Sequence, residues 1–139
     1  MNTTYFLNLV AGNVFKTKTS PAIPTNYYIG LSTTTPSNTS SGISGVTEPA
    51  TSSGYSRIQL SSLSSPVNGV ITNSADINWP ESTANWGTIT HYVVFDNATR
   101  ASGNTLFYAP LSTPRTVEAG TIMSIRSGAL NITVTNKTN

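Results

Sequence analysis

Cysteine is absent from this chain of 139 residues. Its absence excludes disulfide bonds, thiolate metal ligands and a cysteine nucleophile, so packing and hydrogen bonds must hold the fold together. Charge is also scarce, because Lys, Arg, Asp and Glu make up 9% of the residues, against roughly 25% in an average soluble domain. Ser, Thr and Asn therefore have to supply most of the polar surface.

The few basic residues are scattered and form no run. The formal net charge is +2 and the pI is about 9.1, which reflects the scarcity of acids. Without a basic stripe that could follow a phosphate backbone, we expect no nucleic-acid partner. The basic positions are Lys16, Lys18, Arg57, Arg100, Arg115, Arg126 and Lys137.

Long hydrophobic runs are missing as well. The opening stretch TYFLNLVAGNVF is apolar, but Asn8, Gly12 and Asn13 interrupt it, so we expect neither a signal peptide nor a membrane span. Its apolar residues approximate a helical stripe, with Asn2 or Thr3 as the cap. Residues 1–25 are therefore predicted to form a short N-terminal helix or an extended arm. The stripe consists of Phe6, Leu9, Val10 and Val14.

The sequence contains one histidine, His91, within WGTITHYVVFD (residues 86–96). In an extended strand its side chain would project with Ile89, Val93 and Phe95, opposite Thr88, Thr90, Tyr92 and Val94. Asp96 lies five positions on, which places it on the other face and out of hydrogen-bond reach. We therefore interpret His91 as a packed strand residue and not as a catalytic base.

Other catalytic and ligand-binding patterns are also missing. The chain has no H-E-x-x-H, no Gly-rich phosphate loop and no Asp-x-Asp-x-Asp calcium loop, so no metal and no cofactor is predicted. The acidic residues each stand beside turn residues, where carboxylates are mostly solvated, and no glycosidase pair is expected. We predict that the protein is not an enzyme. The whole set of acids is Glu48, Asp76, Glu81, Asp96 and Glu118.

From Asn26 onward, short apolar runs alternate with Gly, Pro, Asn and Ser clusters, which is typical of all-β domains. ALNITV shows the period of two most clearly, with Leu130, Ile132 and Val134 on one face. We predict an all-β fold, a single antiparallel β-sandwich or jelly-roll-like domain over residues 26–139, with a long polar loop over residues 32–54. The predicted strands are Tyr27–Leu31, Tyr55–Leu60, Gly69–Thr72, Ile77–Trp79, Gly87–Phe95, Thr105–Leu111, Ile122–Arg126 and Ala129–Val134.

Several stretches resemble, in order and spacing, a family of small virion structural proteins of tailed bacteriophages. The most distinctive is WGTITHYVVFDNAT; the others are YYIGLSTTTP, GVTEP, SGYSRIQL, TNSADINWP, PLSTPRTVEAGT and ALNITV. The resemblance implies a β-sandwich at the surface of the virion, with other capsid or tail proteins as partners. It implies no catalytic residue.

Two functions are compatible with this resemblance. The first is a capsid decoration (cement or auxiliary) protein, most simply a homotrimer, that stabilises the particle through multivalent surface contacts. The alternative is a tail-fibre or tail-appendage component that adheres to host-surface glycans. We favour decoration at this point, because so short a chain has little room for the shaft that a fibre needs.

Apolar residues in segments that we expect at the surface are the candidates for contacts between subunits. The N-terminal segment and the loop provide a set that either contacts neighbouring subunits or folds back onto the chain's own core. Trp79 and Trp86 either close the ends of the core or form a glycan platform. The candidate assembly contacts are Phe6, Leu9, Val10, Val14, Phe15, Ile43 and Val46.

Overall fold

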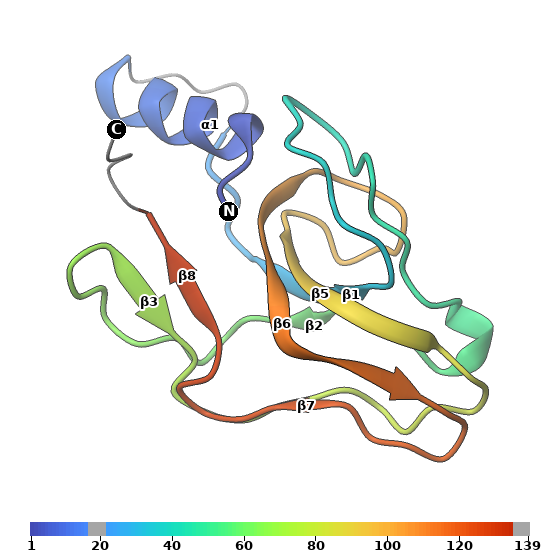
Figure 1. The fold of residues 1–139 in the computed structure, drawn as a ribbon. Helices are drawn as coiled ribbons and strands as arrows, with labels where there is room; N and C mark the ends of the chain where they lie inside the picture. The colour runs from blue at the N-terminus through green and yellow to red at the C-terminus, as the bar shows by residue number, and fades with distance from the viewer. Residues whose placement is uncertain (17–21, 135–139) are drawn as a thin grey trace.

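A computed structural model describes residues 1–16 and 22–134 (Figure 1). Residues 17–21 of the predicted N-terminal segment, and the last five residues of the predicted β domain, lie outside the described ranges. The elements are α1 (Thr4–Phe15), β1 (Tyr28–Ser32), a 3-10 turn (Thr51–Ser53), β2 (Ile58–Gln59), β3 (Val70–Thr72), β4 (Ile77–Asn78), β5 (Gly87–Phe95), β6 (Thr105–Val117), β7 (Ser124–Ile125) and β8 (Asn131–Thr133).

The described elements build one four-stranded antiparallel sheet and two short ladders. The sheet has the order β2-β1-β5-β6, and the ladders pair β3 with β8 and β4 with β7, all antiparallel. The predicted all-β class with a short N-terminal helix is confirmed. Ile77 of β4 and Ile125 of β7 join the inner side chains of the sheet in one buried cluster, so the ladders supply the second layer.

Two of the predicted strands differ most from the observed ones. Tyr55–Leu60 is reduced to the two residues of β2, because Tyr55 and Arg57 are drawn into polar contacts with a neighbouring loop. The strand that begins at Thr105 continues beyond the predicted end to Val117. Its continuation follows a local irregularity, in which Leu111 to Pro114 of β6 stand opposite Thr90 alone.

Because of the same irregularity, the alternation predicted for β5 is wrong at Ile89. Ile89 does not share its face with His91, Val93 and Phe95, because the ladder shifts register between Ile89 and His91. Ile89 is fully buried in the main core together with Tyr92 and Val94. A break of this kind bends a strand and re-aims the side chains that follow, which regular alternation cannot anticipate.

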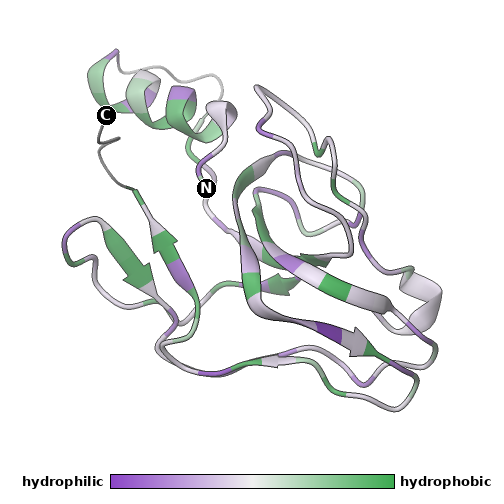
Figure 2. Ribbon diagram, viewed as in Figure 1, coloured by the Kyte–Doolittle hydropathy of each residue, from purple (hydrophilic) through white to green (hydrophobic). Residues whose placement is uncertain are grey.

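The long polar loop between β1 and β2 covers the second face of the sheet. There Val93, Phe95 and Tyr108 form a smaller buried cluster, against which Ile43 and Val46 of the loop pack. Gly30 makes room on this face, since a Cβ atom would lie 2.5 Å from the Tyr55 hydroxyl and 2.9 Å from a Phe95 ring carbon. Both faces of β1 and β5 are therefore largely buried, and in Figure 2 green, hydrophobic segments alternate with white and purple ones along β5 and β6.

The N-terminus is attached to β6 before α1 begins. Thr3 N–H donates to the Leu106 carbonyl at 3.0 Å, Asn2 bridges to Phe107, and the Met1 amine donates to the Tyr108 carbonyl. Thr3 also caps α1, because its Oγ1 accepts from Phe6 N–H at 3.2 Å. This fixes the start of the helix at one of the two predicted caps. No helix in the described ranges is long and apolar enough to cross a membrane.

Candidate functional site

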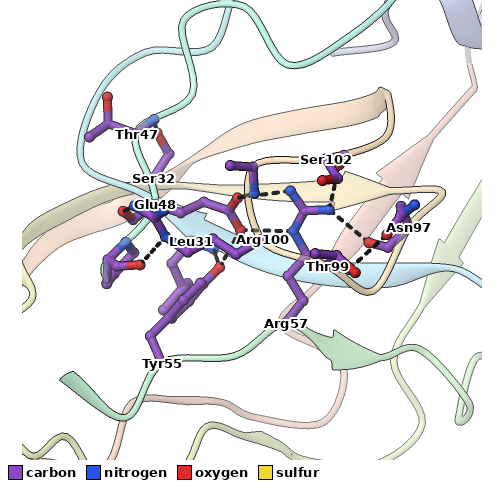
Figure 3. A network of polar contacts seen from close by, with 12 residues as sticks. Leu31, Ser32, Thr47, Glu48, Tyr55, Arg57, Asn97, Thr99, Arg100 and Ser102 are labelled. Carbon is purple, nitrogen blue, oxygen red and sulfur yellow. Dashed lines mark hydrogen bonds and ion pairs between the residues drawn. The ribbon is translucent and has the colours of Figure 1, made fainter. Parts of the chain in front are cut away.

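The densest polar cluster joins Glu48 of the long loop to Arg57, which lies just before β2. Arg57 donates from Nε to Oε1 and from Nη2 to Oε2 of Glu48, both at 2.8 Å, in a bidentate ion pair (Figure 3). The two side chains are 0% and 2% exposed, so this pair lies inside the protein. It is the only ion pair within residues 1–16 and 22–134.

Most of the remaining hydrogen-bonding capacity of the pair is also used. Tyr55 OH donates to Glu48 Oε1 at 2.8 Å and Ala101 N–H donates to Oε2 at 3.0 Å. Arg57 Nη1 donates to the carbonyls of Asn97 and Ser102 at 2.7 and 2.9 Å. Each carboxylate oxygen thus accepts two hydrogen bonds, which leaves no open position where a substrate could approach.

Titration of the cluster follows from these contacts. Burial raises the pKa of Glu48, but hydrogen bonds from Arg57, Ala101 and Tyr55 outweigh it, and the net pKa is lowered. Burial and the neighbouring Glu48 charge raise the pKa of Tyr55. At neutral pH the carboxyl is therefore ionised and the phenol protonated, so neither group is poised for acid–base catalysis.

The cluster instead holds two loops onto the sheet. Arg100 donates from Nε to the Pro49 carbonyl at 2.6 Å and from Nη2 to the Glu48 carbonyl at 2.8 Å. The guanidinium of Arg57 lies 3.5 Å from the centre of the Phe95 ring. The loop around Glu48 and the turn between β5 and β6 are thereby joined through side chains, as Figure 3 shows.

His91 and Asp96 have separate partners, as the sequence predicts. His91 Nδ1 and Thr90 Oγ1 are 2.8 Å apart, and the imidazole lies edge-on to Tyr108 with ring centres 6.5 Å apart. Burial lowers the pKa of His91. Asp96 instead accepts from the backbone N–H and side-chain amide of Asn104 at 2.7 and 2.8 Å, which shapes the turn after β5.

A family model described as Podophage GP4 fiber I protein gp80 matches residues 2–133. The chain belongs to this family. The match covers α1 and every strand, so the predicted resemblance to virion structural proteins of tailed phages is confirmed at this level. Among curated proteins no match is found.

Membership of the gp80 family makes the chain a bacteriophage structural protein. The family description names a fibre and not a capsid decoration, so it favours the tail-fibre alternative over the reading that we preferred from chain length. Chain length is a weak guide to this choice, because it describes one polypeptide and not the assembly of which that polypeptide is a part.

The candidate contact residues of this gp80-family chain fall into three groups. Leu9 is buried, at 3% exposure, and Phe6 is half-buried against the same core. Ile43 and Val46 are half-buried on the second cluster. Exposed apolar side chains remain in the second half of α1, where Phe15 is 85% exposed. This exposed group is Val10, Val14 and Phe15.

The two tryptophans of the alternative glycan platform lie inside the domain. Trp79 is 2% and Trp86 is 4% exposed, and the indole of Trp86 donates to the Ser53 carbonyl at 2.9 Å. Trp86 also meets Tyr55 edge-on, with ring centres 5.5 Å apart. In this conformation both rings belong to the core, and neither presents a free face to a sugar.

Sequence reasoning missed the Glu48–Arg57 pair, because it expected every acid to be solvated at a turn. No signal in the sequence near either residue indicates the pair, since Glu48 and Arg57 lie nine positions apart in a segment rich in turn residues. In the described ranges no three His, Asp or Glu side chains gather as a group that could hold a metal ion.

Proposed function

We propose that this protein is a non-enzymatic building block of a phage tail fibre, exposed at the virion surface. The observation that carries the proposal is the match to a fibre-protein family over residues 2–133. The polar groups of the buried cluster support it, since they are consumed in fixing loops and leave no reactive group in an open site.

Assembly through the exposed end of α1 is part of this proposal. Val14 and Phe15 are 62% and 85% exposed, and α1 contains no charged residue. An exposed phenylalanine beside other apolar side chains is the kind of surface that subunits bury on association, at about 25 cal/mol per Å² of apolar area. We propose that it contacts another copy of this chain, in a homotrimer.

Purified particles provide the test of location. Cross-linking mass spectrometry of intact virions should join this chain to tail proteins, and its copy number should be a small fraction of that of the major shell protein. A copy number close to that of the shell protein, with cross-links to it, would instead identify a capsid decoration. Absence from purified particles would refute both.

The assembly surface is tested with point variants. Deletion of the N-terminal segment is unsuitable, because Thr3 and Leu9 are part of the fold. Light scattering should show a trimer for the native chain and a monomer for Val14→Ser with Phe15→Ser. The matched control is Thr113→Ala, an exposed residue on β6. A native monomer, or a variant that remains trimeric, would contradict this use of α1.

A further inference from the structure

An elongated groove runs beside the second half of β6. One hollow of about 580 Å³ lies between β6 and the segment that carries β7, and a second of about 480 Å³ adjoins it. They share Thr113, Arg115, Ile122 and Met123, so they form one continuous depression, here called the β6 groove. Its polar lining includes Arg115, Arg126, Ser112, Thr113, Ser124 and Asn131.

The groove is formed where β6 departs from regular pairing. Leu111 to Pro114 stand opposite the single residue Thr90, and all but Pro114 line the larger hollow. Extra residues in a strand bend it and redirect its side chains, and such bulges are common beside binding sites. The irregularity therefore turns hydroxyl groups of β6 towards the space in front of β7.

Both arginines of the groove are free to bind a ligand. Arg115 and Arg126 are exposed, and neither guanidinium is hydrogen-bonded or ion-paired with another described residue. Arg57 and Arg100, by contrast, donate hydrogen bonds to Glu48 and are not available to a ligand. Two unpaired guanidinium groups in one groove favour an anionic ligand, because each can bind a carboxylate or phosphate through two hydrogen bonds.

No carboxylate in the described chain competes for this position. Neither hollow is lined by Asp or Glu. Asp76 accepts a hydrogen bond at 2.7 Å from the N–H of Ser127, the residue after Arg126, but it lines a different hollow. In a chain with so few charges, the groove is a local concentration of positive charge.

The edge of β6 argues against a peptide strand as the occupant. β6 is the last strand of its sheet, and its outer edge pairs with the N-terminus only as far as Tyr108. Beyond that point Pro110 and Pro114 have no N–H to donate, and prolines at a sheet edge prevent another strand from adding. A ligand here must be recognised by side chains, which in this groove are guanidinium, hydroxyl, amide and apolar groups.

We propose that the β6 groove binds an extended, oxyanion-bearing oligosaccharide, with Arg115 and Arg126 pairing with carboxylate or phosphate groups on neighbouring sugars. Ser112 and Asn131 are placed to hydrogen-bond sugar hydroxyls, and Ser124 can accept from one, since its own proton is donated to Asn78 Oδ1. Ile122 supplies an exposed apolar surface for a ring face. A nucleic acid is disfavoured, because two cations are too few to follow its backbone. The proposal deepens the fibre assignment by naming a ligand class, and it rests on that assignment for its biological setting.

Calorimetry on the purified full chain tests the proposal with defined probes. Hexagalacturonate supplies carboxylates, phosphorylated maltohexaose supplies phosphates, and unmodified maltohexaose is the neutral control of matched length. We expect at least one anionic probe to bind, the neutral one not to bind, and affinity to fall with added salt. Arg115→Gln with Arg126→Gln should weaken binding about tenfold or more.

Lys16→Gln is the matched control, since Lys16 is an exposed cation at the end of α1 and outside the groove. It should leave affinity unchanged, and all variants should keep the native melting temperature because the replaced groups are exposed. Failure of both anionic probes, or unchanged affinity in the double arginine variant, would overturn the proposal. Tighter binding of hexaglutamate than of either glycan would overturn it in favour of an acidic protein segment.

These outcomes are separate from those of the fibre assignment. Binding is measured on the isolated chain, so it does not depend on where the chain lies in the particle. If the chain is found at the tail but does not bind anionic glycans, only the groove proposal is refuted. A chain that binds them through the two arginines but is missing from the tail would refute the fibre assignment alone.

Discussion

Replacement of Glu48 by Gln tests the buried ion pair most directly. The substitution keeps the shape of the side chain but removes its charge and places an amide NH₂ against the donors of Arg57, 2.8 Å away. Arg57 is then a buried, uncompensated cation at 0% exposure. Breaking one side of such a pair costs about 3–5 kcal/mol, because the remaining charge has lost both its water and its partner.

Urea unfolding followed by tryptophan fluorescence measures this loss, since Trp79 and Trp86 are buried and should change emission on exposure. In a separate thermal melt, a loss of this size should lower the melting temperature by roughly 10–20 °C for a domain of this length. Glu118→Gln is the matched control, because Glu118 is exposed, and it should shift the free energy of unfolding by less than about 0.5 kcal/mol. If the two variants unfold at the same urea concentration, the pair does not contribute as described.

Three further outcomes follow from packing and titration. Gly30→Ala should lose about 1–3 kcal/mol, because the new methyl group would displace the Tyr55 hydroxyl 2.5 Å away; an unchanged urea midpoint would show that the site has spare room. Leu9→Ala should lower the free energy of unfolding by about 2–5 kcal/mol, whereas Phe15→Ser should leave it almost unchanged. Equal losses of stability in the two variants, measured by thermal unfolding, would contradict the burial of one side of α1. Because the fold lowers the pKa of Glu48 below its ordinary value of 4.5, its contribution is present above that pH and is lost as the pH falls; stability that holds steady between pH 5 and about 2 would be inconsistent with this.

Local patterns were sufficient to predict the fold class and the positions of the strands. Gly87–Phe95 is observed with the predicted bounds, because its β-branched and aromatic residues and its flanking turn residues are local signals. The cap at Thr3 was similarly visible in the sequence, since a threonine before an apolar stripe is a local signal. Period-two alternation also placed Leu130 in the core and Asn131 on the surface, but Val134, which it placed on the same face as Leu130, is 47% exposed.

Long-range contacts were not predictable in the same way. Glu48 meets Ala101, which is 53 positions away, and no pattern near either residue indicates the contact. The register shift at Thr90 depends on how many residues β6 inserts opposite it, which is a property of two strands together. The β6 groove depends on the same shift, so Arg115 and Arg126 appeared in the sequence only as two of several scattered bases.

The register shift between β5 and β6 has a consequence for how relatives of this protein can differ. On the β5 side, one residue added or removed between Ile89 and Tyr92 would exchange the buried side chains of the two cores, so the length of that segment is fixed. On the β6 side, Ser112 to Pro114 lie outside the ladder and are exposed, so they can change in number without moving it, whereas Leu111 packs against the core. Insertions and deletions in the family should therefore concentrate at Ser112 to Pro114, where they would reshape the groove and leave the fold intact.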